Sequence, residues 1–395
     1  MRESFRNYVF LLLILFSATP ASAVLENKVL IVPGITGSIS TKLFCDNFRD
    51  IVDVEEWLKN TGKIDILIPR EWALDPILST YTELQLYLAR LSLTPIPVPY
   101  DWRLSIPEIA EQFLKPHIDA AIARNARVDI VAHSMGGLVT RYYIQTFGVA
   151  GIRKVFFLGT PHRGAVATYS LWQGGDSYGP EKLNRLKSEI FLENIKQGCG
   201  CDNDPDVRFI RSGCLPAVNP ISSIQALLPV FPHLRGEKLK KPTRYVSVDP
   251  RNMCQQNDFL NLLNARADLM LANSVQYFIY AGTTEKTPVL VIPKSTVYDC
   301  ARESWPDGEV KSIKQVKSGD NQVLFSESAC PKSTIPAFAD IPCTTTDTIH
   351  PDSKKPSSHI THGDLPTIFK EEIAAKIKEP MCGDSYLEGS EECDD

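Results

Sequence analysis

The sequence predicts an α/β fold with a mainly parallel sheet and helices on both faces. Short apolar runs that are typical of buried strands occur at residues 28–33, 95–99, 128–132 and 154–158. Helical spacing of apolar residues fills two of the intervals, at 105–123 and 136–147. Strands without polar alternation indicate a sheet that is covered on both sides, and the alternation of strands with helices indicates parallel connections.

The ends of these elements carry their own signals. Ser105 is expected to cap the helix at 105–123, and Pro107 falls in its first turn. Further strands are expected at 244–248 and 275–281, and a final helix at 366–378. The 395 residues fit one large domain with insertions, and the formal net charge of −5 is mild. No basic block indicates a nucleic-acid partner.

Residues 1–23 have the pattern of a secretory signal peptide. Two arginines precede an apolar run at 8–16, and small residues at 21–23 suit signal peptidase. Cleavage there would give a secreted, periplasmic or extracellular protein without a membrane span. An uncleaved anchor is the alternative, although the apolar run is short for a span.

Ten cysteines fit this export route. An even number in an exported chain indicates disulfides, but the spacing does not reveal how they pair. A metal cluster at Cys199-Gly-Cys201 is the competing interpretation, and no second pair with CxxC spacing supports it.

The chemistry of the chain begins at residues 128–137, VDIVAHSMGG. A buried strand runs into a small-x-Ser-x-Gly turn at Ser134, and a helix follows directly. A serine nucleophile must project from the backbone with room for a carbonyl group, and a strand-to-helix elbow provides this in the α/β-hydrolase fold. Ala132 stands where the first Gly is usual. We therefore predict an α/β-hydrolase with Ser134 as its nucleophile.

Such a nucleophile needs N–H donors for the oxyanion that forms on the substrate. One donor is expected from the residue after the serine, Met135, and the second from the loop after an earlier strand. Residues 32–38, VPGITGS, form that loop, and two glycines let its backbone approach closely. We expect the N–H of Ile35 to be the second donor.

A histidine must act as the base of the predicted triad. The chain order in this fold is Ser, acid, His, which leaves His350, His359 and His362. His362 directly precedes the expected final helix and is favoured. His359 is the alternative.

The acid lies between the serine and the histidine along the chain. Asp299, Asp307, Asp320 and Asp340 are candidates, and spacing alone does not separate them. The turn at Gly319-Asp320 is the best placed of the four.

Together these motifs resemble those of the lecithin:cholesterol acyltransferase-like lipases of the α/β-hydrolase superfamily. The resemblance covers about residues 28–378 and depends on the joint order of PGITGS (33–38), PYDWR (99–103), AHSMGG (132–137), GTPHRG (159–164), LLP (227–229) and GDxxV (319–323). It implies Ser134 as nucleophile, Asp320 as acid and His362 as base. Asn321 departs from the GDGTVP pattern, which has Gly there.

Residues 169–242 interrupt the strand and helix pattern. The segment is irregular and holds three cysteines, and insertions of this length are usually functional. We expect a lid, in which the apolar stretch 221–234 shields an acyl pocket in water and opens onto lipid. A packed subdomain that never moves is the alternative.

These features predict a secreted serine hydrolase that cleaves lipid esters through an acyl-enzyme on Ser134. Its expected partner is a lipid ester or a lipid surface, and no metal or organic cofactor is expected. Three alternatives stay open: an O-acyltransferase in which an alcohol replaces water, an amidase or thioesterase with the same triad, and a non-catalytic binding protein that retains the fold.

Three segments are expected along the chain. They are the signal peptide at 1–23, the catalytic domain at 24–379 and a Cys-rich tail at 380–395. The tail resembles the opening of a short CGDG…GEECDDGN repeat, with Ser385 where the repeat usually has Gly. We expect a small disulfide-closed tail without a catalytic role.

Overall fold

The core of the protein is a six-stranded sheet with the strand order β12-β9-β6-β5-β1-β4. Every pair of neighbours in it is parallel, so the predicted α/β-hydrolase fold is confirmed. The strands are β1 (Lys28–Val32), β4 (Thr94–Pro97), β5 (Val128–His133), β6 (Ile152–Leu158), β9 (Gln276–Ala281) and β12 (Cys343–Thr345). The computed structural model describes residues 28–40, 72–74, 80–174, 222–238, 245–271, 275–296, 298–301, 305–349 and 360–381.

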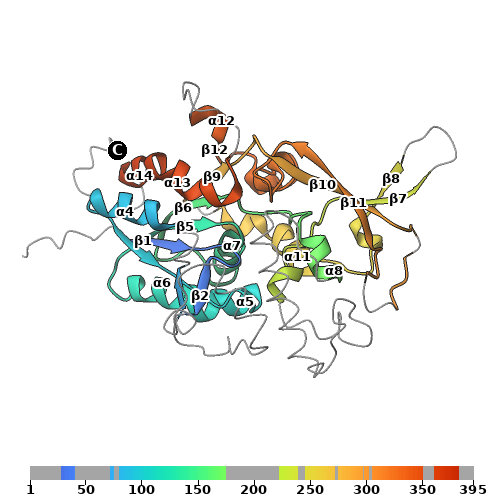
Figure 1. Ribbon diagram of the computed structural model, residues 1–395. Coiled ribbons are helices and arrows are strands. Elements are labelled where there is room, and N and C mark those ends of the chain that lie inside the picture. Colours follow the sequence, from blue (N-terminus) through green and yellow to red (C-terminus); the bar gives the residue numbers. More distant parts are fainter. Residues whose placement is uncertain are drawn as a thin grey trace, which may run out of the picture.

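Side chains of the central strands alternate between two apolar clusters. In β1, Leu30 and Val32 belong to one cluster, and Val29 and Ile31 to the other. The first cluster includes residues of α7 (Met135–Phe147), and the second includes residues of α4 (Thr82–Arg90), α13 (Leu365–Ile368) and α14 (Lys370–Lys378). These helices cover opposite faces of the sheet (Figure 1). Burial on both faces explains why the strands have no polar alternation.

The helix expected at 105–123 has three parts. These are α5 (Ile106–Ile109), a π-helical turn (Ala110–Leu114) and α6 (Lys115–Ile122). Ser105 caps α5, as expected, and forms a capping box with Glu108. Pro116 has no N–H for the helical ladder, which accounts for the irregular turn before it.

A second sheet, with the order β11-β10-β7-β8, lies at the end of the molecule away from α14 (Figure 1). Its strands are β7 (Leu234–Lys238), β8 (Tyr245–Val248), β10 (Lys286–Pro293) and β11 (Val310–Lys317). Only β8 was expected as a strand. Pro288 and Pro293 argue against a strand in β10, and the structure accommodates them with register shifts beside both.

Shorter elements connect these parts. An antiparallel pair is formed by β2 (Ser38–Ser40) and β3 (Trp72–Leu74). The remaining elements are α8 (Thr168–Gly174), α10 (Ser222–Gln225), η2 (Pro250–Asn252), α11 (Asp258–Ala265), η3 (Ala267–Met270), η4 (Phe325–Ala329), η5 (Pro336–Phe338), α12 (Thr346–Ile349) and η6 (His362–Asp364).

Two disulfides join four of the ten cysteines, Cys254 with Cys300 and Cys330 with Cys343. The prediction of disulfides is confirmed for these four. The other six cysteines, the signal segment at 1–23 and nearly all of the tail lie outside the described residues, as does much of the segment 169–242. In the part of the chain that the structure describes, no helix has the length and apolar character of a membrane span.

Candidate active site

Ser134 lies in the sharp turn between β5 and α7. Its backbone has φ 54° and ψ −125°, a conformation that costs an L residue about 1–3 kcal/mol. Its N–H donates to the carbonyl of Leu158 over 2.8 Å, which anchors the turn to the end of β6. A strained serine between a strand and a helix is the geometry expected of a nucleophile elbow.

The loop after β1 lies directly against this turn. A Cβ on Gly136 would be 2.4 Å from the carbonyl oxygens of Val32 and Pro33, and a Cβ on Gly34 would be 2.7 Å from the Cβ of Ser134. Only glycine permits an approach this close. The structure therefore brings the predicted oxyanion loop and the predicted nucleophile together.

Both predicted oxyanion donors are at this junction. Met135 is the first residue of α7, and the first N–H groups of a helix have no acceptor within it. Ile35 lines the pocket, in a turn closed by the N–H of Gly37 on the carbonyl of Gly34 over 3.0 Å. Among the described residues, the N–H of Ile35 has no hydrogen-bond partner.

The side chains of Asp320 and His362 form a hydrogen bond. Oδ2 of Asp320 lies 2.7 Å from Nδ1 of His362, and the carboxylate is fully buried. Oδ1 accepts the backbone N–H groups of Gln322 and Val323 over 3.1 and 2.8 Å. A carboxylate that accepts from His362 fixes the proton of a neutral imidazole on Nδ1, and its Nε2 has no hydrogen-bond partner among the described residues.

The end of β6 leaves space for this acid–base pair. Gly159 has φ 55°, and a Cβ there would be 2.9 Å from Oδ2 of Asp320 and 3.0 Å from Cε1 of His362. The motif that begins at Gly159 also anchors the loop after Asp320. Ser328 donates to the carbonyl of Gly164 over 2.6 Å and accepts the N–H of Arg163 over 3.2 Å.

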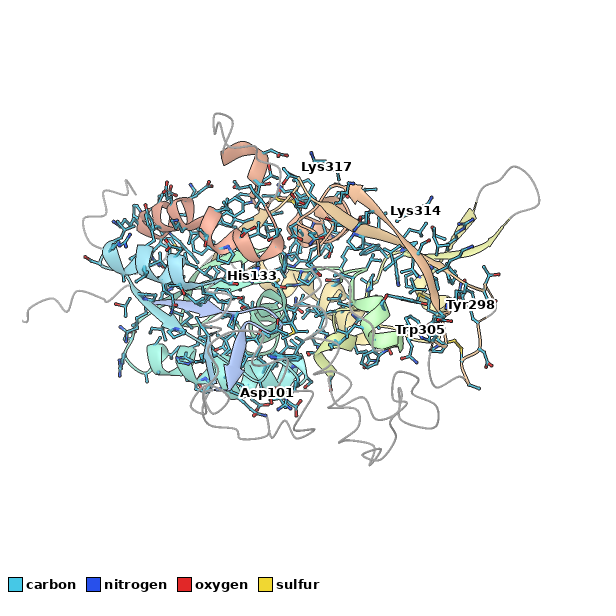
Figure 2. All side chains as sticks on the ribbon, in the orientation of Figure 1. Asp101, His133, Tyr298, Trp305, Lys314 and Lys317 are labelled. Carbon is cyan, nitrogen blue, oxygen red and sulfur yellow. A yellow bond between two sulfur atoms is a disulfide. The ribbon has the colours of Figure 1, made fainter. Side chains whose placement is uncertain are left out.

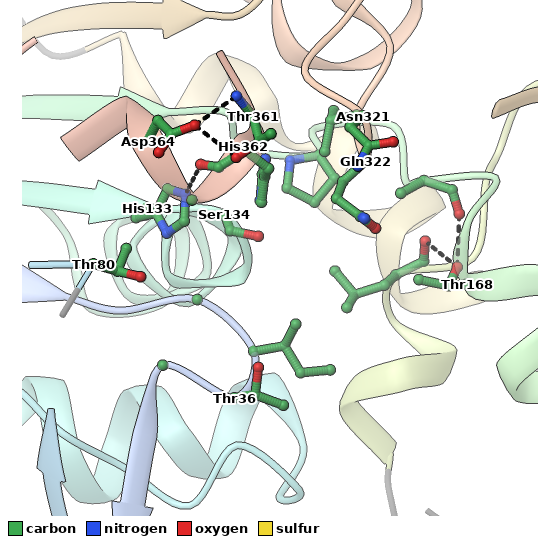
Figure 3. Close-up of a pocket in the computed structure, with 18 of the residues that line it drawn as sticks. Thr36, Thr80, His133, Ser134, Thr168, Asn321, Gln322, Thr361, His362 and Asp364 are labelled. Atoms are coloured by element: carbon green, nitrogen blue, oxygen red, sulfur yellow. Dashed lines mark hydrogen bonds between the residues drawn. The ribbon is translucent and has the colours of Figure 1, made fainter. Parts of the chain in front are cut away.

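Ser134 and His362 line the same cavity, which has a volume of about 310 Å³ (Figure 3). Ile35, Leu227 and Val323 supply apolar parts of its wall. This volume lies at the lower end of the range for small-molecule sites. Leu227 comes from the apolar stretch 221–234 and brings that stretch to the pocket.

The other candidate acids do not contact His362. Asp307 is buried, and its carboxylate accepts the N–H groups of Cys254 and Gln255 over 2.5 and 2.9 Å. Asp299 and Asp340 are exposed. The candidate bases His350 and His359 lie outside the described residues.

The PYDWR motif supports the oxyanion loop from behind. The hydroxyl of Tyr100 donates to the carbonyl of Pro33, and the backbone N–H of Tyr100 donates to Oγ of Ser38 over 3.1 Å. Burial raises the pKa of the Tyr100 hydroxyl well above its usual value. Asp101 and Arg103 form a two-pronged ion pair, with distances of 2.8 and 2.7 Å. The contacts of this motif are therefore structural.

Two further residues belong to the site. His133 lines the pocket, and it was not selected from the sequence. Its Nε2 lies 2.9 Å from the carbonyl oxygen of His362, and its Nδ1 lies 2.9 Å from the hydroxyl of Tyr81. That hydroxyl also accepts the N–H of Gly34 over 2.8 Å. The AHSMGG motif contained His133, whereas nothing in the sequence marked Tyr81.

Residues 92–196 match the lecithin:cholesterol acyltransferase family. The segment matched to lecithin:cholesterol acyltransferase includes Ser134, the AHSMGG motif and the GTPHRG motif. The family resemblance predicted from the sequence is confirmed over this segment. None of the curated proteins matches the sequence.

Several solved structures are similar to the chain. Phospholipase PlaB from Legionella pneumophila has 16% identity over 53% of this chain and 37% of that chain, with a TM-score of 0.32. A chain of the Tle4–Tli4 complex has 15% identity over 83% and 78%, with a TM-score of 0.42. Bromoperoxidase from Bacillus anthracis has 12% identity over 90% and 92%, with a TM-score of 0.38.

Proposed function

We propose that the protein hydrolyses carboxylic esters of lipids, with Ser134 as nucleophile, His362 as general base and Asp320 as the acid that orients it. One observation carries the proposal. Asp320 and His362 are 2.7 Å apart at a pocket whose wall also contains the strained elbow at Ser134. Ser134, Asp320 and His362 also occur along the chain in the order nucleophile, acid and base that is usual for the fold.

In the proposed acylation step, Nε2 of His362 takes the proton of the Ser134 hydroxyl while Oγ bonds to the ester carbonyl carbon. The carbonyl oxygen becomes an oxyanion and accepts hydrogen bonds from the N–H groups of Ile35 and Met135. The carboxylate of Asp320 stabilises the imidazolium that forms. Collapse of the intermediate breaks the ester bond, and the leaving alcohol takes the proton from His362.

Water completes the proposed cycle. His362 removes a proton from a water molecule, which attacks the acyl carbon on Ser134. Collapse of the second intermediate releases a fatty acid and returns the proton to the serine. The residues of the site suffice for every proton transfer in this cycle.

The pocket wall and the family match support lipid esters as substrates. Ile35, Leu227 and Val323 offer apolar contacts to an acyl chain. We propose that the segment around Leu227 is part of a lid within 169–242 that opens at a lipid surface. Secretion through the signal peptide belongs to the same proposal, and the two disulfides are compatible with it.

O-acyl transfer is the second candidate function, because the matched family model is that of an acyltransferase. The first half of the reaction would be the same, and an alcohol would replace water in the second half. Product analysis with and without an acceptor alcohol distinguishes the two. A new ester formed faster than free acid would identify a transferase.

A fluorophosphonate probe tests the nucleophile directly, because it labels activated serines. We expect one equivalent to label the wild-type protein and none to label Ser134→Ala. A panel of esters, assayed below and above the aggregation point of each, then identifies the substrate class. A wild-type protein that is folded and takes no label would contradict the proposal and favour a binding protein.

A further inference from the structure

We propose that His133 and Tyr81 are positioning residues, which together fix the oxyanion loop to the main chain of the catalytic base. This inference rests on the proposed function, because it assigns roles relative to Ser134 and His362. We call the hydrogen-bonded path from Gly34 through Tyr81 and His133 to the carbonyl of His362 the Tyr81–His133 bridge. His133 is 5% exposed and Tyr81 2% exposed, so the bridge is buried. Figure 2 shows His133 in the middle part of the molecule.

The carbonyl acceptor at the end of the bridge determines which atom of each pair along it carries the proton. The carbonyl oxygen of His362 can only accept, so the proton of His133 must be on Nε2. Nδ1 of His133 is then a bare acceptor, and the Tyr81 hydroxyl must donate to it. The hydroxyl oxygen is left to accept the N–H of Gly34. Burial keeps His133 neutral, and for a neutral ring only this arrangement satisfies all three hydrogen bonds, so the bridge has a single direction.

This direction excludes His133 as an alternative base. Both of its ring nitrogens are used, Nε2 as a donor and Nδ1 as an acceptor. It therefore has no lone pair to take the proton of Ser134, although it is adjacent in sequence. His362 is the histidine of this pair whose Nε2 is available.

The bridge also assigns the N–H groups of the loop. The N–H of Gly34 is used by Tyr81, whereas that of Ile35 has no partner among the described residues. The loop is thereby held at the N–H of Gly34, and both Gly34 and Ile35 line the pocket. Because the other end of the bridge holds the main chain of His362, oxyanion donor and base keep a fixed separation.

A neutral His133 suits this role. The rings of His133 and His362 have centroids 4.7 Å apart, so a charge on the first would oppose the imidazolium that forms on the second. Burial holds the pKa of His133 well below its usual value, and the neighbouring His362 lowers it further. The bridge therefore adds no charge that competes with the reaction.

Tyr81→Phe removes the central hydroxyl of the bridge and leaves the ring in place. Misplacement of reacting groups by about 1 Å can cost about 100-fold in rate, so we expect kcat to fall about 10- to 100-fold with KM nearly unchanged. Tyr280→Phe is the matched control. Its hydroxyl is buried in the same apolar cluster and has no hydrogen-bond partner among the described residues, so its loss should leave kcat unchanged.

His133→Gln and His133→Phe test the other half of the bridge, which is the hydrogen bond from His133 to the carbonyl of His362. Gln can still donate to the carbonyl of His362 and Phe cannot, so kcat should fall less for Gln than for Phe. The double variant Tyr81→Phe/His133→Phe should be no slower than His133→Phe alone, because the bridge is already broken. Thermal unfolding of each variant shows that the protein compared is folded.

The outcomes separate this inference from the proposed function. Ser134→Ala that retains full turnover would overturn the proposed function. If Ser134→Ala is inactive but the losses in the double variant multiply, or Tyr81→Phe is as fast as Tyr280→Phe, the positioning role is wrong and the triad stands. Loss of thermal stability with an unchanged kcat would also assign the bridge to folding alone.

Discussion

Asp320 contacts His362 twice, once through the side chains and once through the main chain. The carboxylate is 2.7 Å from Nδ1, and the N–H of His362 donates to the carbonyl of Asp320 over 2.8 Å. The first contact sets the tautomer of the ring, and the second sets the position of the residue that carries it. Asp320 therefore positions both the ring and the main chain of His362.

Asp320→Asn should decrease kcat by about 10⁴-fold, because an amide in place of the carboxylate favours the wrong histidine tautomer. Steady-state kinetics on a soluble ester measure the loss. Asp307→Asn is the matched control, since Asp307 is also buried and accepts backbone N–H groups, but at a different place. It should lose stability and retain the kcat of the folded protein. Equal kcat values for the two variants would remove Asp320 from the mechanism.

Ser134→Gly should be more stable than Ser134→Ala by about 1 kcal/mol, although both should be inactive. Glycine relieves the cost of φ 54°, which alanine does not, and part of that gain is offset by the larger entropy of glycine in the unfolded chain. Urea unfolding of the two variants under identical conditions measures the difference. A more stable alanine variant would show that the elbow is not strained.

Leu227→Ala should reduce the rate on a long-chain ester by roughly tenfold relative to a short one, because contacts to the acyl chain are lost. Leu227 and the neighbouring Leu228 are both buried in the main core, but of the two only Leu227 lines the cavity. Leu228→Ala should therefore cost about 2–5 kcal/mol of stability without changing the ratio of the two rates. A ratio that changes equally in both variants would argue against an acyl contact at Leu227.

Acid should destabilise the protein through its buried histidines. Burial lowers the pKa of His233 from 6.5 to about 4. Between these values the unfolded chain binds a proton that the folded protein does not, so stability decreases as pH falls, by about 2 kcal/mol at pH 5. His233→Asn keeps a donor for the carbonyl of Phe231 and cannot titrate, so it should lose less stability between pH 7 and 5. Urea unfolding at both pH values checks this, and identical losses would contradict it.

The two disulfides should differ in their effect on turnover. Their sequence separations of 46 and 13 residues predict losses of about 4 and 3 kcal/mol when the bridges of Cys254–Cys300 and Cys330–Cys343 are removed by serine pairs. The second bridge joins the loop after Asp320 to β12, so its removal should also lower kcat. Thermal unfolding measures the loss of stability in each serine-pair variant, and steady-state kinetics measure its kcat. An equal kcat in both pairs would show that the bridge does not hold the acid.

Much of the main sheet and the contact between Asp320 and His362 could be predicted, because their signals are local. The short run at 128–132 is rich in β-branched residues and is typical of a buried strand, and the elbow at Ser134 requires small neighbours. The order of the triad then narrowed the histidines to three, and the expected final helix selected His362. In the structure, Asp320 is hydrogen-bonded to His362, whereas the candidate acids at 299, 307 and 340 do not contact that histidine.

The second sheet and the bridge had no local signal. Strand β10 contains two prolines, and β11 has three lysines and mostly exposed side chains, so neither has the pattern of a buried strand. Tyr81 is 52 residues from His133 and 47 from Gly34, and its role depends on contacts that only the fold creates. The position of His133 beside Ser134 in the sequence does not reveal which groups its two ring nitrogens bind.

Two kinds of position in and around the pocket differ in their tolerance of mutation. At Gly136 any side chain would collide with carbonyl oxygens, and at Gly159 with Asp320 and His362. Variants at these two positions should therefore be mainly inactive or unfolded. At Ile35, Leu227 and Val323 the wall is made by side chains, which can be exchanged for larger or smaller ones. Engineering of acyl selectivity should therefore diversify those three positions and keep the glycine frame fixed.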